Sequence, residues 1–262
     1  MKECELPPES ALTDLSRAGD VNTERMEFRI SRIAPRAKVL VTGLPDMGNV
    51  AGISMEVLVR SCNLEEFASA LGDWPPFVTH TGSMIRFERG WYRFYGSDAH
   101  DFVALTGSYQ PPESNALYEL CNAVLDLAQS IGVETVISLG AAHFGEGFIE
   151  NPRVFFAATS ERMAEKARLH GALPLPDEGY ITGYNGLIHG LAMERGMEGL
   201  CLLGEIGNPR VRQPAAAKAV LQVLSSMLNV SIDYTDLDRE IEQMRAMRAL
   251  RRWRRDQPPG VM

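Results

Sequence analysis

The sequence predicts an α/β domain in three layers, with a mostly parallel, mixed sheet and a C-terminal helix. Short apolar segments typical of strands alternate with helical segments along almost the whole chain, as in a sheet covered by helices on both faces. A predicted hairpin at residues 83–95 either makes the sheet mixed or adds a side lobe. After the last apolar helix comes a charged segment at residues 236–255, which we expect to form a helix of its own.

A strand, a turn and a helix open the predicted domain. Met26–Ile33 alternates like a half-buried edge strand, and Val39–Val41 is short and apolar like a central strand. Val50–Cys62 carries apolar residues at helical spacing, so we expect a helix there.

The β-rich stretch that follows contains many aromatic residues. We expect Arg89 and Gly90 to turn a hairpin whose second strand begins at Trp91. Because side chains alternate along a strand, Trp91 lies on one face while Tyr92 and Phe94 lie on the other. One face is expected to be buried. The other either leaves aromatic area for a partner or is covered by the same chain.

The second half of the chain alternates apolar strands with amphipathic helices. The expected strands are Phe102–Leu105, Thr135–Leu139, Val154–Ala158 and Gly199–Leu203. The expected helices are Ser114–Ile131, residues 161–170 and Pro214–Leu228. Their ends carry recognisable signals, since Gly132 follows the first helix, Ser160 caps the second and proline opens the third.

The last helix, Asp236–Arg255, begins with acidic residues and ends with arginines, an order that complements the helix dipole. Its apolar stripe is expected to pack on its own domain or on a neighbouring subunit, with a nucleic-acid contact as the alternative. The chain then divides into a disordered tail at residues 1–24, an α/β core domain at 25–233, the C-terminal helix at 234–256 and a disordered end at 257–262.

The composition excludes several classes of protein. Of the 262 residues, 45% are hydrophobic and 23% charged, which suits a globular protein with a sizeable core. No apolar run approaches the ~20 residues of a membrane helix, and no signal peptide or disulfide pattern is visible. We therefore expect a cytoplasmic protein that contacts no membrane. The net charge of −8 argues against general nucleic-acid binding.

A candidate site lies beyond the carboxyl ends of the strands, where parallel sheets bind ligands. The segments after the strands are rich in glycine, so backbones can approach a ligand closely there. These segments are Gly43–Asn49, Thr106–Gln110, Gly140–Glu146, Gly183–Gly190 and Gly204–Asn208. The candidate ligand- or partner-binding residues are Gly43, Pro45, Asp46, Gly48, Asn49, Gln110, Asn185 and Glu205.

The segment Lys38–Gly52, KVLVTGLPDMGNVAG, has the strand, turn and helix of a phosphate-binding loop without its chemistry. The spacing G-x-x-x-x-G matches half of a P-loop, but Asn49 and Val50 stand where lysine and serine or threonine are needed. Asp46 within the turn would repel a phosphate. The loop resembles an active-site loop whose reactive groups are missing, which favours binding over catalysis.

Two catalytic interpretations remain open beside this one. Glu205 or His143 would act as a general base in the first. In the second, His143, Glu146 and His189 would hold a metal, although no H-E-x-x-H spacing joins them. No G-x-S-x-G nucleophile motif is present, and Cys201 is expected to be a buried free thiol. We expect no catalytic residue, no metal and no cofactor.

Three loop motifs, in this order, carry a resemblance to a known family. They are G-L-P-x-M-G-N in VTGLPDMGNVAG, T-G-x-x-Q-P in LTGSYQPPESNAL and T-G-x-N-G in ITGYNGLIHGL. Together they resemble the proteasome assembly chaperone family, in the branch of archaea and bacteria that is similar to the second eukaryotic assembly chaperone. The resemblance covers residues 26–255.

The resemblance implies a phosphorylase/hydrolase-like α/β fold, homo-oligomers of three or four subunits and no established catalytic residues. It implies a non-enzymatic, assembly chaperone-like protein that binds partner subunits, with proteasome subunits as the expected partners. Some archaeal relatives dock on the proteasome through a tail of the form hydrophobic-Tyr-x, but this sequence ends in PPGVM. The alternative is a small-molecule-binding enzyme of the nucleoside phosphorylase or hydrolase type, with Gly43–Asn49, Gln110 and Glu205 around its pocket.

Overall fold

The computed structural model describes residues 26–256, so the tail expected at residues 1–24 and the end expected at 257–262 lie outside the described residues. The strands of the main sheet are β1 (Arg29–Ile30), β2 (Val39–Gly43), β3 (Glu65–Gly72), β6 (Gly90–Gly96), β7 (Phe102–Gly107), β8 (Thr135–His143), β9 (Val154–Ala158), β10 (Leu173–Pro174) and β11 (Glu198–Ile206). A separate hairpin consists of β4 (Thr79–Thr81) and β5 (Met84–Arg86). The helices are α1 (Val50–Ser61), α2 (Ser114–Ser130), α3 (Glu161–Leu169), α4 (Gly183–Glu194), α5 (Pro214–Leu228) and α6 (Thr235–Asp256).

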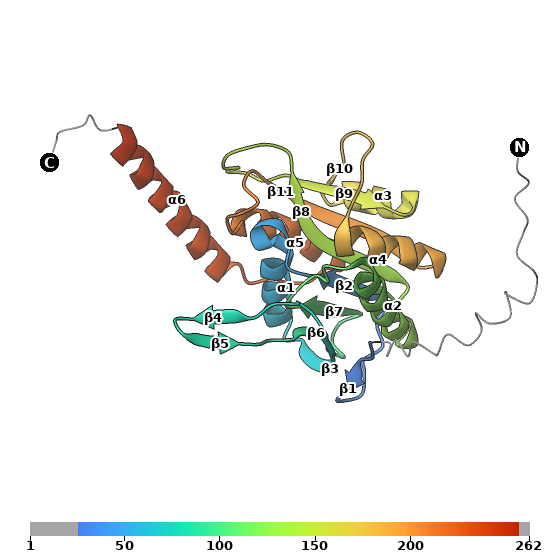
Figure 1. Cartoon of the computed structure of the whole chain (residues 1–262). Coiled ribbons are helices and arrows are strands. Elements are labelled where there is room, and N and C mark those ends of the chain that lie inside the picture. Colours follow the sequence, from blue (N-terminus) through green and yellow to red (C-terminus); the bar gives the residue numbers. More distant parts are fainter. Residues whose placement is uncertain (1–25, 257–262) are drawn as a thin grey trace, which may run out of the picture.

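The sheet is mixed, with three parallel pairs in the centre and a fourth, β9–β10, at one edge. Its strands follow the order β1-β3-β6-β7-β2-β8-β11-β9-β10, and Figure 1 shows helices on both faces. Strands β7, β2, β8 and β11 are parallel neighbours, whereas β1, β3, β6 and β7 pair antiparallel at one end. The predicted α/β fold is confirmed. Within residues 26–256, no helix is long and apolar enough to cross a membrane.

Two apolar cores lie on opposite faces of the sheet. Helices α1 and α5 pack on one face against residues such as Val41, and α2 and α4 pack on the other against residues such as Leu40. Both of these β2 residues are fully buried, because neighbouring side chains of a central strand point to opposite faces. The short apolar run at residues 39–41 therefore predicted a central strand correctly.

The hairpin predicted at Arg89 and Gly90 is wrong. The turn lies instead at Gly82, between β4 and β5, where φ is +58°. Gly90 begins β6, and its backbone N–H donates to the carbonyl of Trp74. A Cβ on Gly90 would lie 2.9 Å from that carbonyl oxygen, so the glycine marks close packing and not a turn. The alternation predicted within β6 is confirmed, since Tyr92 is fully buried and Trp91 only partly.

The segment expected as a loop at Gly183–Gly190 is also different, because it forms the first turns of α4. Three glycines within eight residues lower helix propensity, which is why the sequence indicated a loop. Packing overrides that preference, since Tyr184 and Ile188 are fully buried against the sheet.

Helix α6, expected from the charged segment, leaves the body of the domain and projects from it (Figure 1). Its first turns bury Leu237 and Ile241, whereas Met247, Leu250 and Trp253 farther along are exposed.

Candidate functional site

The strand-end loops converge in the middle of the sheet. Neighbouring strands β2 and β7 are followed by α1 and α2, which lie on opposite faces. Open α/β sheets bind ligands beside such a position. The structure brings Pro45, Asp46, Gln110 and Asn185 together here, and it places Glu205 in a separate ion pair.

Gln110 joins the loop after β7 to two other segments. Its side-chain nitrogen donates to the carbonyl of Pro45 at 3.2 Å, and its side-chain oxygen accepts from the backbone N–H of Tyr184 at 3.3 Å. A Cβ on Gly183 would lie 2.9 Å from that same oxygen. Both ends of the amide therefore hold the strand-end loops together.

Asp46 turns its carboxyl group back onto the chain. Burial raises its pKa from 3.8 to about 7, although the backbone N–H groups of Ala51, Ala141 and Val50 favour the charged form. The bond to Ala51, in the first turn of α1, is 2.9 Å long. The chain's own carboxyl group therefore occupies the helix N-terminus at which a phosphate would bind.

Two buried oxygens near this point accept no hydrogen bond from the described residues. They are Oδ2 of Asp46 and Oδ1 of Asn185. The amide nitrogen of Asn185 donates to the carbonyl of Leu139 at 3.2 Å, and a Cβ on Gly140 would collide with it. Buried acceptors are normally bonded, so a neutral Asp46, whose carboxyl carries a proton, suits this environment better than a charged one.

Gly43 and Gly48 serve close packing. A Cβ on Gly43 would lie 3.0 Å from the Cβ of Ala51, so the glycine lets α1 approach the end of β2. Gly48 has a φ of +67°, which favours glycine. Its N–H donates to the carbonyl of Pro209 and its carbonyl accepts from the N–H of Gln213, each at 2.9 Å. The loop after β2 is thus fastened to the loop before α5.

Asn49 and Glu205 also make contacts within the chain. Asn49 adopts a φ of +55°, and its side chain covers Gly52 in the first turn of α1. Glu205 receives two side-chain hydrogen bonds from Arg153, at 2.6 and 2.9 Å. The Arg153 guanidinium lowers the pKa of the Glu205 carboxyl and occupies both of its oxygens, so Glu205 is unsuited to act as a general base.

The residues considered for metal binding do not meet. Residues 26–256 contain no group of three or more His, Cys, Asp or Glu side chains placed to hold a metal. His189 is buried, bonds Ser138 at 2.8 Å, and has a pKa that burial lowers to about 4. Cys201 is a buried free thiol, as expected, and burial raises its pKa to about 12. Neither group is charged near neutral pH.

The pair of Ser138 and His189 was missed by sequence reasoning. Asn185 and His189 are four residues apart, so they share one face of a helix. The spacing would have indicated that both side chains face the sheet only if residues 183–194 had been predicted as a helix.

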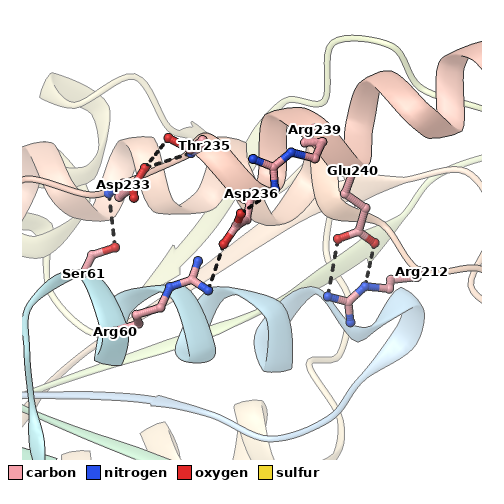
Figure 2. Close-up of polar contacts among 8 residues, drawn as sticks. All are labelled: Arg60, Ser61, Arg212, Asp233, Thr235, Asp236, Arg239 and Glu240. Atoms are coloured by element: carbon pink, nitrogen blue, oxygen red, sulfur yellow. Dashed lines mark hydrogen bonds and ion pairs between the residues drawn. The ribbon is translucent and has the colours of Figure 1, made fainter.

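A second candidate site is the base of α6, where ion pairs hold the helix against the body (Figure 2). Asp236 pairs with Arg60 of α1 at 3.1 Å and with Arg239 at 2.9 Å. Glu240 pairs with Arg212, just before α5, at 2.7 Å. The pairs with Arg60 and Arg212 join α6 to the body, whereas the pair with Arg239 lies within α6.

The turn before α6 is bonded as well (Figure 2). Asp233 accepts from the backbone N–H of Thr235 at 2.9 Å and from its hydroxyl at 2.6 Å. The N–H of Asp233 donates to the hydroxyl of Ser61 at 3.1 Å, at the end of α1.

Two projections of the domain, the β4–β5 hairpin and α6 (Figure 1), carry exposed apolar side chains. On the β4–β5 hairpin, Ile85 is 70% exposed and Phe87 beside it 65%. On α6, Trp253 is 60% exposed, with Met247 and Leu250 similar. Large apolar patches on soluble domains mark surfaces that bind partners.

Comparison with known proteins identifies a family. The model of the PAC2 family matches residues 40–249. An uncharacterized protein of Methanocaldococcus jannaschii is 30% identical over 210 residues, which cover 79% of this chain and 80% of that protein.

Solved structures share the fold. PbaB of Pyrococcus furiosus, an archaeal proteasome activator, has a TM-score of 0.74 and 27% identity, with 88% of this chain and 99% of that chain covered. PbaA of the same organism, an archaeal homolog of proteasome-assembly chaperone, has a TM-score of 0.68 and 23% identity, covering 83% and 92%. The Mycobacterium tuberculosis proteasome-assembly chaperone homologue Rv2125 has a TM-score of 0.64 and 22% identity, covering 85% and 97%.

Proposed function

The chain belongs to the PAC2 family, as its three loop motifs indicated, and on that premise we propose that it is a non-enzymatic, assembly chaperone-like protein. It binds partner protein subunits and works as a homo-oligomer of three or four copies. The similarity to PbaB supports proteasome subunits as the class of partner.

One contrast within the structure carries this proposal. At the strand ends, the side chains of Gln110 and Glu205 are hydrogen-bonded to the chain itself, as is one carboxyl oxygen of Asp46. On the hairpin and α6, by contrast, large apolar side chains face solvent. A protein partner that covers the apolar side chains of the hairpin and α6 would therefore gain binding free energy.

The pattern along α6 supports assembly with further chains. In a helix of ~3.6 residues per turn, a spacing of three moves each side chain back by about 60°. Ile241 faces the body, and the steps through Met244, Met247, Leu250 and Trp253 carry the apolar stripe around the helix and away from it. A stripe that turns from the body toward solvent suits a helix that packs first on its own domain and then on another copy.

Affinity capture tests the partner. The full chain, tagged and expressed in its own cells, is expected to bring down proteasome subunits, which native mass spectrometry of the eluate would identify. A chain carrying Ile85→Ser and Phe87→Ser serves as the matched control. Recovery of the tagged protein without any proteasome subunit would contradict the proposed partner.

A second candidate function rests on the two unbonded oxygens of Asp46 and Asn185, which a small ligand with hydrogen-bond donors would satisfy. A thermal-shift screen with nucleosides and inorganic phosphate tests it. A ligand at 100 times its dissociation constant adds about 2.7 kcal/mol to stability. We expect none of these compounds to change the melting temperature. A clear rise that the variant Asn185→Ala abolishes would favour the small-molecule enzyme.

A further inference from the structure

A crevice under the C-terminal half of α6 combines apolar walls with positive charge. It has a volume of about 390 Å³, and Phe148, Val211, Met244 and Met247 form its apolar walls. Arg248 lies at its edge, with the guanidinium carbon 3.8 Å from the centre of the Phe148 ring. Its size lies within the range of about 300–1,000 Å³ typical of ligand pockets.

Two arginines at this crevice, Arg245 and Arg248, form no ion pair within residues 26–256. Arg245 donates to the carbonyl of Glu150, at 3.5 Å. Residues 243–255 include six arginines and no acidic residue. The surface therefore fits an occupant that brings an apolar side chain together with negative charge.

The loop between β10 and α4 offers that combination. Tyr180 is 98% exposed, the most exposed of the large hydrophobic side chains described. Asp177 and Glu178 beside it are exposed, and neither forms an ion pair within residues 26–256. An exposed aromatic side chain with a polar end is a common anchor of protein interfaces.

We propose that Tyr180 of one copy enters the α6 crevice of the next copy, with Asp177 and Glu178 facing Arg245 and Arg248. This inference rests on the homo-oligomer of the proposed function and names the surfaces that join its copies. The aromatic ring packs among the apolar walls, and the two carboxylates meet the two guanidinium groups.

The position of the two surfaces makes the contact intermolecular. Figure 1 shows the β10–α4 loop rising at the top of the view, whereas α6 projects to the left, so we assign the contact to two different copies. A contact between two different surfaces is heterologous, and it closes into a ring when the rotation between copies allows. The three or four copies of the proposed function would require a rotation of about 120° or 90° between neighbours.

Sedimentation velocity of the full chain over a range of concentrations tests the contact. Tyr180→Ser, Glu178→Arg and Arg248→Glu should each raise the dissociation constant of the oligomer at least tenfold. The double variant with Glu178→Arg and Arg248→Glu should recover much of the loss, because the two charges are exchanged. Circular dichroism of each variant should match the wild type, since Tyr180 and Glu178 are exposed in the single chain.

Matched controls lie on α3. Glu165→Arg makes the same charge change at an exposed position, and Leu169→Ser removes an apolar side chain that is 84% exposed. Neither should weaken the oligomer. An oligomer unaffected by the Tyr180, Glu178 and Arg248 variants would overturn this interface and leave the proposed function standing. A wild-type chain that stays monomeric at all concentrations would overturn both.

Discussion

Asp46 and His189 are buried titratable groups whose pKa values move in opposite directions. Burial raises the pKa of Asp46 from 3.8 to about 7, and it lowers the pKa of His189 from 6.5 to about 4. In both cases the folded protein favours the neutral form, because the charged form loses its hydration. The two groups therefore give stability opposite dependences on pH.

Replacing Asp46 by Asn should reveal the pH dependence that His189 gives to the free energy of unfolding. The raised pKa of Asp46 contributes stability that is fully present below pH 3.8 and is lost as the pH rises toward about 7. The lowered pKa of His189 contributes stability that is present above pH 6.5 and is lost as the pH falls toward about 4. In Asp46→Asn only the histidine remains, so the free energy of unfolding should fall with acidification by up to about 1.4 kcal/mol per pH unit. Urea unfolding in half-unit pH steps measures this slope.

His189→Gln should show the reverse. Only the aspartate then remains, and the free energy of unfolding should fall as the pH rises from about 4 to 7. The wild-type curve should be flatter than either variant between pH 4 and 6.5, because its two slopes oppose each other. Parallel curves for all three proteins would contradict the opposite pKa shifts.

At this scale the sequence located Asp46 but did not reveal its environment. The order of strand, turn and helix placed it at a helix N-terminus, where we expected it to repel a phosphate. The carboxyl group of Asp46 occupies the phosphate position because it bonds the N–H groups of Ala51 and Ala141. Ala141 belongs to β8, a strand distant in sequence. Glu205 was a candidate base because its pairing with Arg153, a residue 52 positions away, leaves no mark in the local sequence.

Among the elements, those with local signals were predicted well. Helix α5 has the bounds Pro214–Leu228 that proline and apolar spacing indicated. Ser160 caps α3 as expected, accepting from the N–H of Met163. Strand β3, in contrast, was not predicted, because Glu65–Gly72 begins with two glutamates and is defined by its antiparallel pairing with β6. Pairing between distant segments leaves little trace in a local pattern.

The attachment of α6 should depend on apolar contacts more than on its ion pairs. Ile241 is buried, and Ile241→Ala should lower the free energy of unfolding by about 2–4 kcal/mol. Glu240→Gln removes the pair with Arg212, whose side chains are 30% and 45% exposed, and should cost less than about 1 kcal/mol. Urea unfolding at equal protein concentration and at two salt concentrations compares them. A larger effect of Glu240→Gln than of Ile241→Ala would reverse this ranking.

For the whole molecule, the exposed half of α6 should govern assembly without governing folding. Met247, Leu250 and Trp253 are exposed in the single chain, so their removal takes little from either core. A chain ending at Gln243 should therefore keep its circular dichroism spectrum and lose its oligomeric mass in light scattering. An unchanged mass would place the interface elsewhere on the body.

The β4–β5 hairpin should govern partner binding and leave assembly intact. A two-stranded hairpin standing alone is only marginally stable in water, so exposed apolar side chains on it are best explained by a partner that covers them. Ile85→Ser combined with Phe87→Ser removes two such side chains, which are 70% and 65% exposed. The variant should retain the mass of the wild-type oligomer in light scattering and recover fewer partner subunits in affinity capture. Loss of the oligomer in this variant would show that the hairpin joins copies of the chain, and the partner surface would then have to lie elsewhere.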